Sequence, residues 1–343
     1  MARASGNPIK LLLDGFDWAG RSGRLQFFYM FILVFAAAQI VSLGMETSQL
    51  IANIGWIISA LLTVPFFGHL LRRLNDLRLS GWFWLFSLVP GANLLFLLFL
   101  LLKTPSQRIQ RDTTGFRAIG MVGCFFLALV ILSRVFWTPY LAVSGAMKPS
   151  ILIGDIVVGT QWFRGVDRAD VVVVSHPITG AATIFRVVGI PGDRVQMRDG
   201  ALWLNGVEVR RVDQGLFVER MERQGPFGLY PRCYNGAVGA GARCEKRLWR
   251  EEIDGRVYAV LNVSDSALDN TAEITVPAGH IFVLGDNRDN AVDSRISPGA
   301  SGMGLVQNDA VRGLAKRVLL SFEGPEIWHF WTLRPERTMM GLQ

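Results

Sequence analysis

Residues 144–155 read SGAMKPSILIGD. This stretch begins with the small residues Ser-Gly-Ala and continues through Met-Lys-Pro-Ser to the apolar run Ile-Leu-Ile. It ends in Gly-Asp, residues that are typical of turns. Two later stretches carry the same Gly-Asp pair, FRVVGIPGDRV at 185–195 and GDNRDNAVDSR at 285–295. Runs rich in Val, Ile and aromatic residues, bounded by turn residues such as Gly, Pro and Asp, recur through this region, as β-strands do. They predict an all-β domain from about residue 139, with strands at 155–162, 170–177, 182–193, 194–206, 257–263 and 280–286.

One part of this region lacks the periodicity of strands. Residues 210–271 are more polar, and we expect an inserted subdomain with long loops over about 203–279. Near its start, DGALWLNG at 199–206 predicts a hairpin. The insertion holds Cys233 and Cys244 in the Gly-rich stretch CYNGAVGAGARC. A disulfide between them and two free thiols remain equal alternatives, because spacing alone does not fix the geometry.

The first 140 residues hold a large share of the hydrophobic residues, which make up 50% of the chain. Four runs, at 25–44, 51–70, 82–102 and 118–136, are about as long as the roughly twenty residues that cross a hydrocarbon layer ~30 Å thick. The first run is longer than an ordinary signal core and precedes further runs, so a cleaved targeting peptide is not expected. The sequence therefore predicts an integral membrane protein.

Basic residues beside these runs predict their orientation. If the N-terminus and residues 72–78 are both cytoplasmic, the first two runs form a hairpin. Keeping residues 103–117 inside as well requires that 82–102 enters and leaves on one side, which Pro90-Gly91 at its middle would permit. The last run then crosses outward, and everything after about residue 140 is extracytoplasmic. In the alternative all four runs cross, and either the C-terminal half is cytoplasmic or the N-terminus is outside.

The net charge of +7 does not indicate nucleic acid, because many basic residues flank the apolar runs. We attribute this charge to topology and to contact with lipid headgroups, so membrane lipid is an expected partner. The four histidines, His69, His176, His280 and His329, lie in unrelated contexts. No catalytic triad, metal site or cofactor is predicted from them.

The stretches at 144–155, 185–195 and 285–295, in this order and after a hydrophobic anchor, resemble the conserved boxes of type I signal peptidases. These membrane-anchored enzymes cut signal peptides from exported proteins, and the similarity spans about residues 137–322. The resemblance implies a β domain outside the membrane, with a site near the lipid surface where substrate lies as an added strand. The first 117 residues, with FDWAGRSGRLQFFYMF and RRLNDLRLSGW, resemble a small bacterial inner-membrane domain family without an established activity.

Members of the signal peptidase family use a Ser/Lys dyad, in which apolar surroundings lower the pKa of the lysine so that it can take the serine proton. The resemblance puts the nucleophile position at Ala146, the base position at Phe185 and a supporting serine position at Ala291. All three carry apolar residues. The resemblance therefore implies the family fold without the family dyad, and we expect the Phe185 ring to pack against Met147 or nearby apolar residues.

Other positions of the family pattern are retained. Ser144 matches a serine that helps to stabilise the oxyanion, and Asp293 and Arg295 match a charged pair that braces the site wall. The remaining retained residues are Met147 and Arg186, which we expect to shape the site, and the turn-forming Gly154, Asp155, Gly192, Asp193, Gly285 and Asp286.

A substitute dyad can be drawn from Ser144 and Lys148, with Ser150 nearby. On a loop this spacing has no defined geometry, and we expect Lys148, which precedes Pro149, to be exposed. A rescued dyad is therefore the weaker hypothesis.

The sequence predicts a membrane α-helical N-terminal domain followed by an all-β, signal-peptidase-like extracytoplasmic domain. The expected boundaries are 1–117 for the helical domain, 118–140 for the anchor, 141–325 for the β domain and 326–343 for a tail. We expect a multi-pass protein of the bacterial inner membrane that does not cleave but binds signal-peptide or exported-protein segments, or other membrane proteins as an accessory subunit. Two alternatives remain: an active signal peptidase with another nucleophile, and a structural scaffold whose peptide cleft is filled by Phe185.

Overall fold

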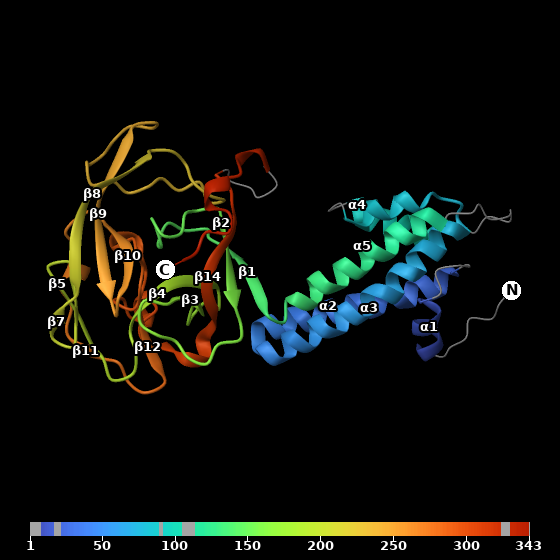
Figure 1. Ribbon diagram of the computed structural model, residues 1–343, viewed down its shortest axis with the longest axis horizontal. Helices are drawn as coiled ribbons and strands as arrows, with labels where there is room; N and C mark the ends of the chain where they lie inside the picture. The colour runs from blue at the N-terminus through green and yellow to red at the C-terminus, as the bar shows by residue number, and fades with distance from the viewer. Residues whose placement is uncertain (1–7, 17–21, 89–91, 105–113, 324–329, 343) are drawn as a thin grey trace. The chain divides into compact units, whose positions relative to one another are not determined.

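The structure is a computed structural model that describes residues 8–16, 22–88, 92–104, 114–323 and 330–342 (Figure 1). The chain divides into two compact units, Met1–Val135 and Phe136–Gln343. The first unit is helical and the second is all-β.

The helical unit contains a hairpin of two long helices. Its elements are α1 (Pro8–Asp14), α2 (Arg24–Thr47), α3 (Gln49–Asp76), the 3-10 segment η1 (Gly81–Leu88), α4 (Ala92–Leu102) and α5 (Thr114–Ser133). Within α2 and α3, Arg24–Met45 and Leu50–Asp76 are long and apolar enough to cross a membrane. The two helices approach closely, since a Cβ on Gly55 would lie 2.7 Å from the Val41 backbone nitrogen. Small residues allow such contact between membrane helices.

The third predicted run, 82–102, is not one continuous helix. It comprises η1 and α4, and Pro90 and Gly91 between them lie outside the described residues. The ring centroids of Phe86 and Phe96 are 5.9 Å apart, although ten residues of a straight α-helix would separate them by ~15 Å. The chain folds back on itself here, which favours the re-entrant alternative.

A buried arginine fixes the end of α4. Arg73 donates to the carbonyl oxygens of Leu100, at 2.8 Å, and Lys103, and pairs with Asp76 at 2.8 Å. The last carbonyl groups of a helix have no partner within the helix, and a cation matches the negative end of its dipole. Arg73 and Asp76 of the RRLND motif therefore hold the C-terminal end of α4 in place.

The predicted fourth run corresponds to α5, which ends at Ser133. Residues 137–140 of the predicted anchor belong instead to strand β1 (Trp137–Leu141) of the β unit.

Three antiparallel sheets form the described part of the β unit. The largest has seven strands in the order β1, β2 (Asp155–Thr160), β14 (Val311–Ser321), β3 (Val171–Ser175), β4 (Ala182–Gly189), β12 (His280–Leu284) and β13 (Val306–Gln307). The second contains β11 (Ile274–Thr275), β5 (Arg194–Arg198), β6 (Ala201–Leu204) and β7 (Val207–Glu208), and the third contains β10 (Arg256–Asn262), β9 (Arg243–Ile253) and β8 (Arg210–Arg220). Short 3-10 turns are η2 (Ala267–Asp269), η3 (Arg288–Asn290), η4 (Pro298–Ala300), η5 (Asn308–Ala310), η6 (Phe330–Thr332) and η7 (Pro335–Arg337).

The seven-stranded sheet buries apolar side chains on both faces. Successive residues of a strand point to opposite faces. Val172 and Val174 of β3 belong to one cluster, which we call the site cluster and which contains Ala146, Phe185 and Ala291. Val171 and Val173 belong to another, the loop cluster, with Ala142, Met147 and Ile151. The unbroken apolar run of β3 therefore reflects burial on both sides.

The prediction of long loops over 210–271 is wrong for two stretches. β8 and β9, of 11 residues each, form an antiparallel ribbon. Their sequences, RRVDQGLFVER and RCEKRLWREEI, carry charges on both faces and so lack the alternation that predicts a strand. The structure joins Cys233 and Cys244 in a disulfide, which ties the segment after β8 to β9. β11 pairs with β5, so the expected insertion shares a sheet with the residues before it.

Candidate functional site

The three positions that the resemblance assigns to catalysis come together. Ala146, Phe185 and Ala291 are 8%, 4% and 5% exposed and share the site cluster. A Cβ on Gly285 would lie 2.3 Å from Ala291 Cβ and 2.7 Å from the Ala146 carbonyl oxygen. The space between positions 146 and 291 is thus so narrow that only glycine fits at 285.

Two hydrogen bonds from Asn287 hold the loop that contains Ala146. The Asn287 backbone N–H donates to the Ala146 carbonyl oxygen at 2.9 Å, and Asn287 Nδ2 donates to the Gly145 carbonyl oxygen at 2.9 Å. Phe185 lies on β4, where it is paired in register with Val172 of β3. Two loops and one strand therefore position the three side chains.

The site cluster carries no hydroxyl and no amine at positions 146, 185 and 291. The resemblance implies two hydroxyl groups and an amine at these positions, whereas this chain has two methyl groups and a phenyl ring there. A nucleophile and its base need to be within hydrogen-bond reach. A lone lysine at position 185 would bury an ammonium without a partner, and the phenyl ring avoids that cost.

Met147 does not lie in the same cluster as Phe185. It is buried in the loop cluster, with Ile151 and Val173, whereas Phe185 packs in the site cluster with Ala146. The ring therefore packs against the nearby apolar residues of the site cluster. Ser144 is exposed at the start of the same loop.

Arg186, next to Phe185 in β4, forms a buried ion pair. Its Nε and Nη2 donate to the two carboxylate oxygens of Asp286 at 2.8 and 2.7 Å, and both side chains are 1% exposed. Nη1 donates to the Ala169 carbonyl oxygen at 2.9 Å, and the guanidinium lies 4.2 Å from the Tyr258 ring centroid. Such bidentate pairs fix geometry as well as charge.

Asp293 and Arg295 form a second buried pair. Arg295 Nε and Nη2 donate to the two oxygens of Asp293 at 2.9 and 2.8 Å. Asp293 Oδ2 also accepts the Gly285 N–H at 3.0 Å. The pair therefore braces the turn that separates Ala146 from Ala291.

Two Gly-Asp turns are built alike. Gly154 and Gly192 have φ values of +89° and +93°, which glycine adopts readily. Asp155 accepts the Leu152 N–H at 2.8 Å, and Asp193 accepts the Ile190 N–H at 2.9 Å. For Asp193, burial acts to raise the pKa, but hydrogen bonds, chiefly from Arg168, hold the pKa below its usual value.

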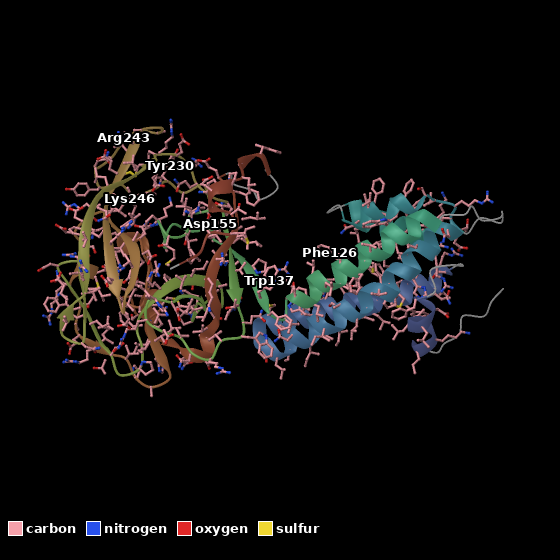
Figure 2. The ribbon with its side chains drawn as sticks, in the orientation of Figure 1. Phe126, Trp137, Asp155, Tyr230, Arg243 and Lys246 are labelled. Carbon is pink, nitrogen blue, oxygen red and sulfur yellow. A yellow bond between two sulfur atoms is a disulfide. The ribbon has the colours of Figure 1, made fainter. Side chains whose placement is uncertain are left out.

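The expectation that Lys148 is exposed is wrong. Its side chain is 5% exposed, and Nζ donates to Glu219 of β8 and to Gln224 Oε1, the latter at 2.6 Å. Lys246 of β9 lies on the other side of the carboxylate, 2.6 Å from Glu219 Oε1, and Figure 2 labels it on the β8–β9 ribbon. We call Lys148, Glu219, Gln224 and Lys246 the lysine cluster.

Burial lowers the pKa of Lys148, although the Glu219 carboxylate opposes this shift. Burial alone would raise the pKa of Glu219, but Lys148 and Lys246 together hold it below its usual value. Sequence reasoning missed Glu219, Gln224 and Lys246, because Glu219 stands 71 residues from Lys148 and no local pattern connects them.

The histidines take separate structural positions. His69 Nδ1 is 2.8 Å from Ser22 Oγ in the helical unit, His176 Nδ1 accepts backbone N–H groups of its own turn, and His280 contacts the Ala278 carbonyl oxygen. His329 lies outside the described residues. Within the part of the chain that the structure describes, no three His, Cys, Asp or Glu side chains are placed to hold a metal ion.

A family model described as "Signal peptidase, peptidase S26" matches residues 116–320, more than half of the chain. The chain belongs to this signal peptidase family. A second model, "Protein of unknown function (DUF805)", matches residues 15–112, which cover much of the helical unit. The chain therefore combines N-terminal helices with an all-β domain of the signal peptidase type.

Individual relatives match between 45% and 59% of this chain. Signal peptidase I of Pseudomonas fluorescens is 30% identical over 225 residues, which cover 59% of this chain and 72% of that protein. Signal peptidase I U of Bacillus subtilis is 25% identical over 199 residues, which cover 57% of this chain and 82% of that protein. A crystal structure of a signal peptidase I from Enterococcus faecalis is 23% identical, covers 45% of this chain and 98% of its own, and gives a TM-score of 0.24.

Proposed function

We propose that this chain is a non-catalytic member of the signal peptidase family that binds extended segments of exported or membrane proteins without cutting them. One observation carries the proposal: Ala146, Phe185 and Ala291 are apolar and lie in one buried cluster. Hydroxyl attack needs an oxygen and a base in contact. These three side chains supply neither.

A free strand edge beside the site supports binding. Residues 182–186 of β4 pair with β3 on one side, whereas β12 pairs with β4 only from Arg186 onward. Within the described residues, no strand occupies the second edge at 182–185. An extended peptide can bind such an edge through backbone hydrogen bonds, which need no catalytic group.

We place the protein in the bacterial inner membrane as a multi-pass chain, with its β unit outside the cytoplasm. The basic residues that flank the apolar runs support this orientation through the positive-inside rule. The Cys233–Cys244 disulfide supports it as well, because structural disulfides persist in oxidising compartments.

A second candidate is an active peptidase that uses Ser144 with Lys148 as base. Its support is the burial of Lys148, which lowers the pKa of the amine toward the range where a lysine can accept a proton. The ion pair between Lys148 and Glu219 argues against this second candidate, because a carboxylate in contact with the amine favours its charged, protonated form.

The test uses the full-length protein, purified in detergent, with a preprotein that carries small residues at its cleavage site. We expect no cleavage, and we expect an uncleaved signal-peptide segment to bind, as measured by fluorescence anisotropy. A mock purification from cells without the protein controls for host peptidase. Cleavage that disappears in Ser144→Ala would overturn the proposal in favour of the second candidate. The absence of peptide binding would favour the scaffold alternative.

A second experiment tests whether the missing hydroxyl and amine groups are the reason that the protein does not cleave. Ala146→Ser alone should stay inactive, because its hydroxyl lacks a base. The triple variant Ala146→Ser, Phe185→Lys, Ala291→Ser supplies hydroxyl, amine and support within a wall that the Asp293–Arg295 pair still braces. Cleavage by the single variant would show that another residue serves as base.

A further inference from the structure

The last described residues return to the seven-stranded sheet, and the C-terminal end lies within the β unit (Figure 1). The Val318 N–H donates to the Met340 carbonyl oxygen and the Leu342 N–H to the Lys316 carbonyl oxygen, both at 2.9 Å. Gly341 and Arg317 form an antiparallel bridge. The C-terminal end is thus an added strand on β14.

It occupies a place that β3 leaves free. β3 pairs with β14 only over Val311–Leu314, and the C-terminal end takes the same edge of β14 from Lys316 onward. An edge with unpaired backbone groups is a ready site for an extended segment. Here the chain itself supplies that segment.

Two arginines anchor the segment before this end. Arg337 Nε donates to Asp155 Oδ1 at 3.1 Å, and its Nη2 donates to the Ser150 carbonyl oxygen at 2.9 Å. Arg334 Nη2 donates to the Ile153 carbonyl oxygen at 2.6 Å. These contacts fix the C-terminal segment on the turn at residues 150–155, which follows the Ala146 loop. Figure 2 labels Asp155 within the β unit.

The end beyond the anchor is held by few contacts. Met339 is 52% exposed and Gly341 is exposed. Leu342 is partly buried and packs against the loop cluster. Besides the two backbone hydrogen bonds, Arg317 Nη1 donates to the Met339 carbonyl oxygen at 3.0 Å. Because local opening is easiest where few apolar contacts are buried, we expect residues 339–342 to detach without disrupting the rest of the sheet.

Space for a larger ligand lies on both sides of this end. A cavity of about 650 Å³ is lined by residues of β14 and by Val171, and one of about 430 Å³ is lined by Ser150 and by Tyr258 of β10. Both are lined by Val257, Gly341 and Leu342. The C-terminal end therefore separates two hollows of one groove between β14 and β10.

We propose that this groove is a docking site for an extended apolar peptide and that residues 339–342 occupy it as a detachable ligand of the same chain. The inference rests on the proposed peptide-binding function and adds its regulation. Backbone pairing with β14 suits any extended sequence. The loop cluster, against which Leu342 packs, favours an apolar side chain at that one position, although charged residues such as Asp170 and Arg256 also line the groove. The anchor keeps the end at a high effective concentration, so a peptide added in trans competes with it.

Displacement of Leu342 by a peptide would affect the loop that carries Ala146, because both contact the loop cluster. Leu342 packs against the cluster that contains Ala142 and Met147, and Met147 directly follows Ala146. A peptide that replaces Leu342 therefore contacts the same cluster as the loop that carries Ala146.

The first test uses a fluorescent peptide with the sequence of residues 338–343, TMMGLQ, and the full-length protein in detergent. A variant that ends at Thr338 keeps both anchoring arginines and should bind this peptide at least tenfold more tightly than the wild type. Leu342→Asp, which puts a charge against the loop cluster, should behave like the truncated form. Met339→Asp adds the same charge at an exposed position and should behave like the wild type. Equal binding by wild type and truncated protein, or no binding by either, would overturn the proposal.

Hydrogen exchange on the unmodified protein tests detachment without any variant. The amides of Val318 and Leu342 should exchange at least tenfold faster than those of the β3–β4 ladder, and faster still when an apolar signal-peptide segment is added. Equal protection of the two groups would contradict a detachable end.

The signal-peptide segment separates this proposal from the proposed function. If neither wild type nor truncated protein binds that segment but the truncated form binds TMMGLQ, the groove stands and the proposed function fails. If both bind the segment with the same affinity, the proposed function stands and the regulatory groove fails.

Discussion

Phe185 and Arg186 are consecutive residues of β4 and both are buried, yet they have different chemistry. Phe185, at the position that the resemblance assigns to the base, packs among apolar side chains, whereas Arg186 makes a bidentate pair with Asp286. A lysine at 185 without its serine partners would be an unsatisfied buried cation, but loss of Arg186 would leave a carboxylate unpaired. We therefore expect the loss of Arg186, which leaves a buried charge unpaired, to destabilise the fold more than the loss of Phe185.

The largest effect should come from Arg186→Ala, which leaves Asp286 buried without a partner. Breaking one side of a buried pair costs about 3–5 kcal/mol of unfolding free energy. Denaturant unfolding of the full-length protein, followed by tryptophan fluorescence, measures this loss. Arg194→Ala is the matched control, because its pair with Glu273, at 3.5 Å, is 52% and 37% exposed and should contribute about 1 kcal/mol or less. Equal losses in the two variants would contradict the comparison.

Phe185→Ala should cost about 3 kcal/mol, since it leaves a cavity in the site cluster. The same unfolding assay applies, with Phe227→Ala as control, because that ring is 69% exposed and its removal should change stability by about 0.5 kcal/mol or less. If the protein binds peptides, the opened cleft should also change the affinity for a signal-peptide segment. No loss of stability in Phe185→Ala would show that the ring does not fill the cluster.

Acid should weaken the lysine cluster. The folded-state pKa of Glu219 is below its unfolded value of about 4.3. Its contribution to stability is therefore complete above that unfolded value and is lost as the pH falls through the folded pKa, because protonation leaves Lys148 and Lys246 without a counter-charge. In Glu219→Gln this loss should already be present at pH 7, so its stability should fall less between pH 5 and pH 3 than that of the wild type. Lys148→Met, which leaves the Lys246 pair intact, should keep the acid transition.

The smallest effect should come from Ser144→Ala. Ser144 is exposed at the start of the Ala146 loop, and exposed substitutions away from special backbone positions change stability by about 0.5 kcal/mol or less. The unfolding midpoint should therefore stay within error of the wild type. A loss near that of Phe185→Ala would mean that this hydroxyl supports the loop.

Much of the β unit could be predicted because its signals are local. Apolar runs bounded by turn residues such as Gly, Pro and Asp correspond to β2, β3, β4 and β12. The ribbon of β8 and β9 could not be predicted, since it carries charges on both faces and derives its stability from pairing. The closeness of the Phe86 and Phe96 rings, 5.9 Å apart, could not be predicted either, because a hydropathy pattern does not show which apolar side chains meet.

The sequence by itself determined which residue types stand at positions 146, 185 and 291, and therefore the absence of a serine, a lysine and a second serine there. It also determined the membrane-length runs, because length and hydropathy are properties of contiguous residues. The burial of Lys148 between Glu219 and Gln224 and the strand that Leu342 adds to β14 exist only in the folded chain. Both depend on side chains and backbone groups that are far apart in sequence, and only the packing of the strands brings such groups within the 3 Å at which a hydrogen bond forms.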